Sequence, residues 1–375
     1  MIRRNFFAIF VILSIFPIVS ISLKVNSNIK IEKIFSYDYV NGIVLEVLEE
    51  KIEKHDLYDS RFVGRQELKI KINQGTLKGQ EFIIQNPINA ERNIIAKANM
   101  KAIFTIRERN GDYSIWLYSY KNDTFIYLLS FIFIGIVAYL GRGKGLRSIL
   151  ALAYAGVILF FVLIPLIFRA YDPIFWTIII ISYLIVISFL LISDYNKKTL
   201  VAIIGTIGGI SLAGLLAYIF GTLTKSSAIY QEHGTQILYL TADYKLKING
   251  LIFVSMLIAS LGAVMDVAMS IASSAEELSY NTKDKEKLFK SCLNIGRDIM
   301  GTMINTLILA FVGSSLNLLL MAWGYRMTFT QLINMPALSV EIIQALAGSI
   351  GIVFTVPFTA FVAVFVINKN LEGKK

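Results

Sequence analysis

Long apolar segments constrain this chain more than any other feature of its sequence. Several of them reach the roughly 20 residues that a helix needs to cross a hydrocarbon core about 30 Å thick. We predict about eight transmembrane helices: residues 1–23, Thr124–Leu140, Ser148–Phe168, Ile174–Ile192, Thr199–Phe220, Asn249–Ser273, Ile299–Trp323 and Val340–Ile367. The last seven form a predicted membrane domain over residues 124–368, and only residues 24–123 have the composition of a soluble domain.

Composition narrows the class of protein further. Hydrophobic residues make up 55% of the 375 residues and the mean hydropathy is +0.64, which excludes an ordinary soluble protein. Cys292 is the only cysteine, and His55 and His233 stand apart without ligand spacing, so neither a disulfide nor a metal site is predicted. The basic turn 141–145 lacks the spacing of a phosphate-binding loop. We therefore expect no cofactor and no enzymatic activity.

The net charge of +10 is distributed in a way that indicates topology. Residues 24–123 carry 16 Lys/Arg and 14 Asp/Glu, so +8 of the total lies in the apolar half and at the termini. Short loops on one side of the predicted spans hold fifteen Lys and Arg residues, against five on the other side. By the positive-inside rule both termini, including the tail 369–375, are in the cytoplasm. The pattern argues against nucleic-acid binding, which needs a basic patch on a folded surface.

The first apolar segment, residues 1–23, is predicted to be an uncleaved signal-anchor, because it is long enough to span a membrane. The alternative is a cleaved signal peptide, since Ser20 and Ser22 provide small residues at a cleavage site. Both interpretations place residues 24–123 outside the cytoplasm.

Residues 24–123 alternate between apolar and polar positions. Leu68, Ile70 and Ile72 alternate with two lysines, as in a strand with one buried face. The dipeptide Asn110-Gly111 lies between two such runs and favours a two-residue hairpin turn. We predict a small extracytoplasmic β-rich domain, a barrel or sandwich that could be OB-like. It would act as a spacer or assembly module, or bind a ligand.

Small residues recur at intervals of four and predict where helices touch. Gly205 and Gly209 lie on one face of their span, and Gly351 lies on a similar face of the last span. Because lipid and leucine are equally apolar, transmembrane helices associate where small side chains let the backbones approach. Gly262 and Gly301 are predicted packing positions as well. The Gly205 face would pack within one chain or between two copies.

Asp266 lies inside a predicted span, where a carboxylate costs at least about 2.5 kcal/mol on insertion scales. It belongs to a stripe of small and polar residues, and the next span carries a second polar face. Further polar residues of the two faces are Ser270, Asp298, Thr302 and Asn305. Two polar faces joined by a charged connector are expected to pack together, so that their polar groups find partners away from lipid.

Three interpretations of Asp266 are open. It could pair with Arg297 or bond to Asn305 and only fix the helix register. It could be a protonatable or ion-binding group at a coupling site. It could also lie nearer the inner surface than its place in the sequence indicates. The connector Glu276–Lys290 is predicted to be a short amphipathic helix at that surface or a solvated loop.

Three stretches resemble the YibE/F family of multispanning bacterial membrane proteins: Gly262–Ser274, Asn294–Ala310 and Gly348–Pro357. The resemblance covers most of the chain. It implies an anchor, a small extracytoplasmic β-rich domain and a helical block in the bacterial plasma membrane. It implies architecture more than activity, because the family has no firmly established substrate.

A more distant likeness is to the carboxyl half of SecD/SecF and RND-type transporters. An Asp near the inner end of a helix, a charged connector and a Thr-rich helix are similar in both. In those families the corresponding Asp lies in a proton relay, so Asp266 would match the relay position, opposite Asp298, Thr302 and Asn305. The eight predicted spans, in place of six, and the small external domain depart from that pattern.

The sequence thus predicts a transporter, permease or export-assisting membrane protein that is proton-coupled through Asp266. The alternative is a non-transporting scaffold or sensor that presents its β domain to an envelope partner. The expected partners are the lipid bilayer and a second copy or another membrane subunit. A polar cavity that reaches Asp266 would favour transport, and a dry bundle with Asp266 paired to Arg297 would favour a scaffold.

Overall fold

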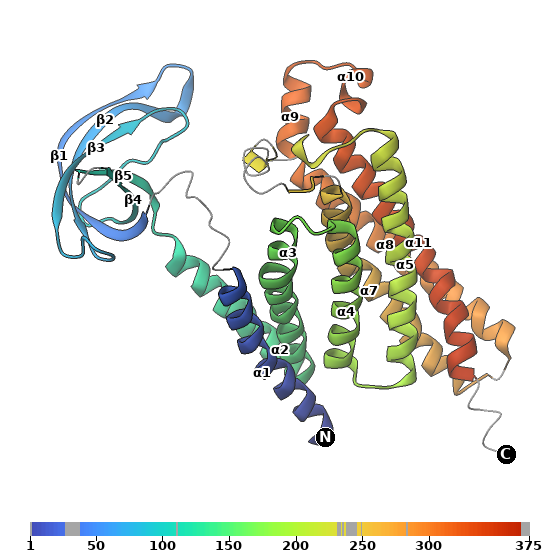
Figure 1. The fold of residues 1–375 in the computed structure, drawn as a ribbon. Coiled ribbons are helices and arrows are strands. Elements are labelled where there is room, and N and C mark those ends of the chain that lie inside the picture. The colour runs from blue at the N-terminus through green and yellow to red at the C-terminus, as the bar shows by residue number, and fades with distance from the viewer. Residues whose placement is uncertain are drawn as a thin grey trace. The chain divides into compact units, whose positions relative to one another are not determined.

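The structure, a computed structural model, describes residues 2–26, 38–109, 112–230, 234, 236–237, 246–248, 250–282 and 284–368. It divides into two compact units, Ile29–Ile136 and Met1–Asn28 with Val137–Lys375 (Figure 1). The predicted hairpin dipeptide Asn110-Gly111 and the predicted tail 369–375 lie outside the described residues.

The first unit is built on one five-stranded sheet. Its strands are β1 (Asp38–His55), β2 (Tyr58–Ile72), β3 (Glu81–Ile88), β4 (Lys101–Arg109) and β5 (Asp112–Tyr120). All neighbours are antiparallel, in the order β3-β2-β1-β4-β5. The sheet curls into a half-barrel (Figure 1). The β-rich unit is therefore confirmed as a half-barrel, and its likeness to an OB fold stays a prediction.

The alternating pattern of the strands explains the core of this unit. Leu68, Ile70 and Ile72 of β2 are fully buried, while the lysines between them point to the other face of the sheet. Phe104 of β4 is fully buried with them. At Gly42 of β1 an added Cβ would lie 2.7 Å from the carbonyl oxygen of Lys71 and 2.8 Å from the Phe104 ring. This position therefore requires glycine.

Two buried amides tie the segment before β4 to the sheet. The side-chain oxygen of Gln66 accepts the backbone N–H of Ala96 at 2.8 Å, and its amide nitrogen donates to the Ala96 carbonyl at 3.0 Å. Asn86 donates to Gln66 at 3.1 Å and to the carbonyl of Ile94 at 2.9 Å. The segment lacks strand pairing here, so these two side chains satisfy its backbone polar groups.

Gln66→Leu is expected to destabilise the β unit by roughly 3 kcal/mol, because it leaves two buried backbone groups of Ala96 unpaired at ~1–3 kcal/mol each. Limited proteolysis of the full-length protein, with the cleavage sites mapped by mass spectrometry, should show faster cutting between β3 and β4. The matched control is Gln85→Leu, since Gln85 is exposed on the neighbouring strand and its side chain donates a hydrogen bond to the half-buried Glu67 at 3.1 Å. Equal cleavage rates for both variants would contradict the role given to Gln66.

The second unit is helical. Its elements are α1 (Ile2–Asn26), the later part of α2 (Asp123–Ile158), a π-helical turn (Leu159–Leu163), α3 (Ile164–Phe168), α4 (Pro173–Ser193), α5 (Lys197–Leu223), a 3₁₀ turn (Ala228–Tyr230), α7 (Leu251–Ser279), α8 (Lys285–Ser314), α9 (Leu316–Gly324), α10 (Phe329–Ile333) and α11 (Pro336–Asn368). Helix starts follow local capping chemistry. Asp172, Asn196 and Asp284 each accept a backbone N–H from the first turn of the helix that follows.

Seven helices among the described residues are long and apolar enough to cross a membrane. The predicted spans Thr124–Leu140 and Ser148–Phe168 both lie in the helical stretch Asp123–Phe168, as two helices joined across a kink. Its backbone breaks at Arg142, with φ 47° and ψ −137°. A Cβ on Gly145 would collide with the carbonyl of Val137, so the chain turns tightly at this break. The sequence analysis ended the first of these spans at Leu140 and placed a basic turn at residues 141–145, which is where the break lies.

The predictions for the last part of the chain need two corrections. The predicted span Ile299–Trp323 is divided at Ser315, where α8 ends and α9 begins. The predicted surface helix in Glu276–Lys290 is absent from the described residues, because α7 continues to Ser279 and α8 already starts at Lys285. The charged residues therefore extend the two helices and leave only a short connection between them.

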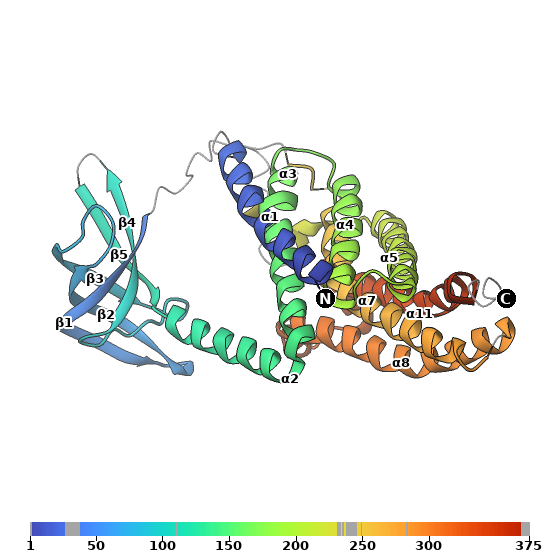
Figure 2. The same ribbon diagram turned by 90° about the horizontal axis from the view of Figure 1, so that it is seen from below.

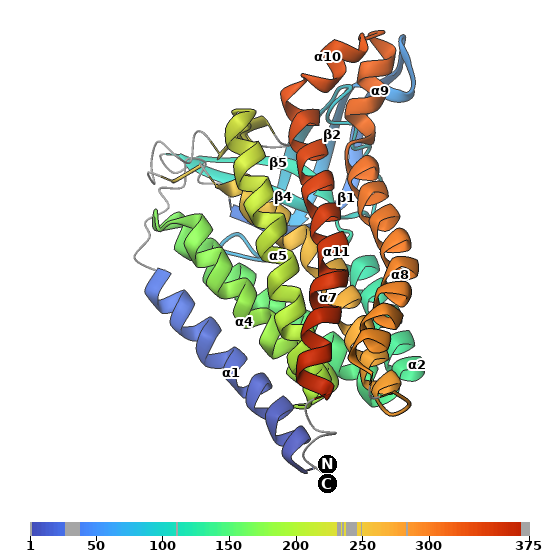
Figure 3. The ribbon, with the colours of Figure 1, turned by 90° about the vertical axis from the view of Figure 1, so that its right-hand side faces the viewer.

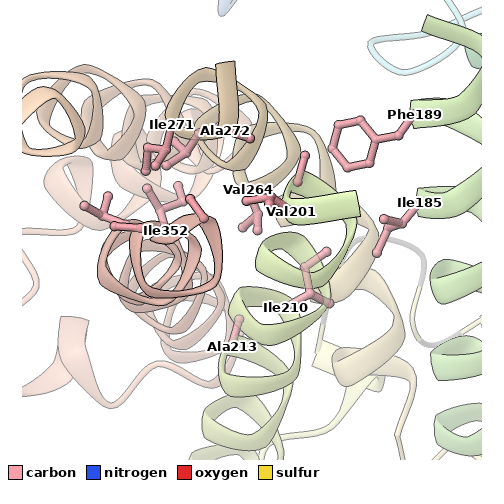
Figure 4. Packing of buried hydrophobic residues seen from close by; sticks show 14 of the residues in the cluster. Ile185, Phe189, Val201, Ile210, Ala213, Val264, Ile271, Ala272 and Ile352 are labelled. Carbon is pink, nitrogen blue, oxygen red and sulfur yellow. The ribbon is translucent and has the colours of Figure 1, made fainter. Parts of the chain in front are cut away.

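Helices α5, α7 and α11 form the centre of the helical unit. Figure 3 shows α11 between α5 and α8. Figure 4 shows how Ile210 of α5, Val264 of α7 and Ile352 of α11 meet in the core together with side chains of α4. A second cluster joins α1, the later part of α2 and α4.

Helices α5 and α11 meet along a seam of small residues. A Cβ on Gly205 would collide with Thr359, and one on Gly209 would collide with Thr355. A Cβ on Gly351 would lie 2.6 Å from the Cβ of Ala213. The two predicted small-residue faces thus pack against each other within one chain, and their contacts repeat at each helical turn.

Candidate functional site on helices α7 and α8

Asp266 lies near the middle of α7, which has 29 residues. It precedes Glu276 by ten residues, or about 15 Å along the helix axis. If Glu276 marks the membrane surface, this is half the thickness of a hydrocarbon core. Because α7 is longer than predicted, Asp266 is also farther from the helix end than the two turns that its predicted span gave.

The two sides of α7 differ in burial. The buried side carries Val264, Val267, Ala268, Ile271, Ala272 and Ala275, all fully covered by neighbouring helices. The opposite side carries Ala259, Gly262 and Asp266, which are exposed, and Ser270 beside them is half-buried. An added Cβ on Gly262 would meet no atom within 4 Å. The carboxylate thus lies on a side of α7 that the described residues leave open.

Helix α8 has a similar division. Its buried positions include Cys292, Gly296 and Leu307, which face the core. Its exposed positions carry the polar residues of the predicted site together with the second small residue: Arg297, Asp298, Gly301, Thr302 and Asn305. An added Cβ on Gly301 would meet no atom within 4 Å. Gly262 and Gly301 therefore differ from Gly205, Gly209 and Gly351, which pack against a neighbouring helix.

One direct contact and one shared contact with α11 give the register of α7 relative to α8. A Cβ on Gly296 would lie 3.3 Å from Cδ1 of Ile271, and a Cβ on Gly348 of α11 would lie within 3.4 Å of both Ser260 and Leu307. Eleven residues separate the two contacts on α7, and eleven separate them on α8. In this antiparallel pair Asp266 is therefore level with Gly301, five residues from the first contact on each helix.

The polar side chains of α8 are directed to their own helix. Arg297 donates to Asn294 at 3.3 Å, and Thr302 donates to the carbonyl of Ile299 at 2.8 Å. In the described part of the chain Asp266 has no hydrogen-bond or ion-pair partner, so the structure shows pairing with neither Arg297 nor Asn305. Asp266, Thr302 and Asn305 are thus brought to similar depths without being joined.

The site offers two carboxylates, Asp266 and Asp298, which are on different helices and have no hydrogen-bond or ion-pair partner among the described residues. Within the described ranges, no three His, Cys, Asp or Glu side chains are placed to hold a metal ion together. A single carboxylate with small and hydroxyl-bearing neighbours can take up and release a proton, or bind a monovalent cation weakly.

Two polar features were missed by the sequence analysis. Gln344 of α11 is buried and donates to Ser255 of α7 at 2.7 Å and to the carbonyl of Ile252 at 3.3 Å. The signal was an amide side chain inside an apolar span. The second feature is a cavity between the break in α2, the start of α5 and α7, lined by Arg142, Lys144, Arg147 and Lys198. The sequence analysis used these residues to assign topology and found that the turn 141–145 lacks the spacing of a phosphate-binding loop.

Comparison with known proteins decides the family. Residues 129–369, which are 241 of the 375 residues, match the model of the family described as YibE/F-like protein. The chain belongs to the YibE/F family. The YibE/F match runs from within α2 to α11, including the whole candidate site, and leaves out α1 and the five strands. No curated protein and no solved structure matches the chain. Family membership and the seven apolar helices fit a multispanning membrane protein.

Proposed function

We propose that the chain is a multispanning transporter of the bacterial plasma membrane, coupled to protons through Asp266. In this proposal both termini are in the cytoplasm, the β unit is extracytoplasmic, and no covalent reaction is catalysed. One observation carries the proposal: Asp266 lies in the middle of a long apolar helix, on its open side, with no partner among the described residues.

The physical basis is the cost of a charge in lipid. An ionised carboxylate at the centre of a membrane costs at least ~2.5 kcal/mol, whereas the protonated form lacks that charge. The open side of α7 can therefore contact lipid or a dry neighbour when Asp266 is protonated, and needs water or a cation when it is ionised. Proton binding would therefore shift the equilibrium between two positions of this side of α7, as does any ligand that binds two states with different affinity.

The small residues beside Asp266 allow such a change. Gly262 and Gly301 leave space on the exposed sides of α7 and α8, next to the carboxylate on one helix and level with it on the other. A substrate, a second copy of the chain or another membrane subunit could occupy this space with close backbone contact. As partners at this space we propose a second copy of the chain or another membrane subunit.

Asp266→Asn is expected to abolish proton movement, because the amide cannot take up a proton at neutral pH. Full-length protein would be reconstituted into liposomes with a trapped pH-sensitive dye. Solutes would then be added one at a time: monovalent and divalent cations, inorganic phosphate, amino acids and short peptides. At least one solute should move protons with the wild type, and none should with the variant.

The matched control is Glu277→Gln, which removes an exposed carboxylate at the end of the same helix and should leave the proton signal unchanged. If Asp266→Asn moves protons at the wild-type rate, Asp266 has no coupling role. If no solute moves protons with the wild type either, the proposal of proton-coupled transport is wrong for this panel of substrate classes, and the second candidate gains support.

The second candidate is a scaffold that presents its β unit to a partner in the cell envelope. The observation that favours it is a hollow of about 260 Å³ in the β unit, lined by Tyr39, Arg92, Trp116 and Tyr118 among others. The rings of Tyr39 and Tyr118 meet edge to face at 4.9 Å. Aromatic side chains with one arginine are the composition of many recognition surfaces.

A further inference from the structure

We infer that the helical unit binds a phosphoryl anion in the cavity beside the break in α2. The cavity has a volume of about 710 Å³ and is formed by three elements of the helical unit. These are the turn of α2 at residues 141–147, the connection between α4 and α5, and the side of α7 that carries Met269 and Ser273. Figure 2 views this end of the helical unit, with α2, α4, α5 and α7.

The charge of the lining is strongly positive. Four cationic side chains line the cavity, Arg142, Lys144, Arg147 and Lys198, against one carboxylate, Asp194. Arg147 lies 3.8 Å from Asp194, and Lys198 lies 3.1 Å from Glu276. Arg142 and Lys144 have no ion-pair partner among the described residues. Arg142 and Lys144, both exposed, are therefore available to bind an anion.

The backbone holds these cations in place. Arg142 adopts a left-handed conformation, φ 47°, between Gly141 and Gly143, and such a conformation is strained for a residue with a Cβ. The close approach of Gly145 to Val137 fixes the other side of the turn. The turn is thus a constrained structure, and it carries two unpaired cations at the mouth of a cavity.

The opposite wall contributes hydrogen-bonding groups. Asn196 lines the cavity and caps α5, accepting the N–H of Thr199 at 2.8 Å. Because α5 begins at Lys197, the positive end of its dipole lies at the same wall. Ser193 and Ser273 add hydroxyl groups to the lining. Guanidinium, ammonium and hydroxyl donors around one space suit an oxyanion with several acceptor oxygens.

A phosphoryl group matches this lining by charge and geometry. It carries one to two negative charges, and arginine can bind two of its oxygens at once. The group could belong to an anionic lipid headgroup, since basic pockets between transmembrane helices bind such headgroups, or to a soluble phosphorylated molecule. The apolar lining residues Ile192 and Met269 are compatible with both sources.

The test measures binding to full-length protein in a zwitterionic detergent by isothermal titration calorimetry. One arm uses a short-chain phosphatidic acid, with the matching phosphatidylcholine as reference, and the other arm uses glycerol 3-phosphate and inorganic phosphate. Wild-type protein should bind at least one phosphoryl compound, and Arg142→Gln with Lys144→Gln should weaken that binding at least tenfold. Binding of the lipid alone assigns the site to a headgroup, and binding of the soluble compounds as well assigns it to the phosphoryl group itself.

The charge-matched control is Lys225→Gln with Lys247→Gln, which removes two lysines that do not line this cavity. It should bind like the wild type. The inference is overturned if neither arm shows binding, or if both double variants weaken binding equally, because the effect would then reflect overall charge. Thermal unfolding of each variant without ligand separates loss of binding from loss of fold. This result is independent of proton movement through Asp266.

Discussion

Replacing Gly209 by leucine will prevent the helical unit from folding, which we expect to see as loss of the monodisperse peak in size-exclusion chromatography. Already the first added carbon would collide with the hydroxyl of Thr355 and lie 3.0 Å from Val264. Overpacking of a tight core typically costs ~1–3 kcal/mol, and here four carbons would enter the contact between α5, α7 and α11. Since Thr355 and Val264 are fully buried, neither has open space into which to move.

Two further variants make this result specific. Gly262→Leu adds the same side chain to α7 at a position where a Cβ meets no atom within 4 Å, so this variant should fold and give a monodisperse peak. In the milder variant Gly205→Ala the added methyl group meets Thr359, and Thr359→Gly should restore part of the lost stability by removing the opposing side chain. Normal folding of Gly209→Leu would show that α5 and α11 are not packed as the structure has them.

The sequence predicted the elements of this fold well where one local pattern determines them. Alternation of Leu68, Ile70 and Ile72 with lysines gave the strand β2, because a strand places every second residue on the buried face. The faces of Gly205 and Gly351 gave helix contacts, because only small residues permit that approach. What each face would touch was not predictable, since the spacing is the same for a contact within the chain or with a second copy.

The breaks were harder to predict than the helices. The break at Arg142 falls in the glycine-rich basic turn that the sequence analysis placed between two spans, but the close approach of Gly145 to Val137 was not predictable from it. The end of α8 was not predicted at all, because Ser315 lies inside an apolar run that has no proline. Such features depend on packing between segments and leave little trace in hydropathy.

The candidate site shows the same limit. That Asp266 and its small neighbours lie on one face of a single apolar helix followed from the sequence, whereas its distance from the helix end did not, because α7 extends beyond the predicted span. Its pairing did not follow, because that depends on how α7 and α8 are rotated toward each other. The structure sets the two helices in register and yet directs Thr302 and Arg297 to acceptors on α8 itself.

Asp266→Leu is expected to stabilise the helical unit, and this is the sharpest way to separate the two candidate functions. A charged carboxylate without a partner opposes insertion by at least ~2.5 kcal/mol, and leucine at the same place favours it. The melting temperature of the purified protein should therefore rise by several degrees. Glu277→Leu, at the end of the same helix, should change it little, because Glu277 lies where water can solvate it.

The direction of the change in melting temperature separates a structural carboxylate from a functional one. A carboxylate that serves the structure holds a partner, and removing it would leave that partner unpaired and lower the melting temperature. A carboxylate that destabilises the fold is retained for another reason, and a group in the middle of a transmembrane helix that can carry a proton supplies one. A variant that is more stable than the wild type and moves no protons would show that Asp266 exchanges stability for activity, as functional sites commonly do. A variant less stable by more than 1 kcal/mol would instead make Asp266 a structural residue of a scaffold.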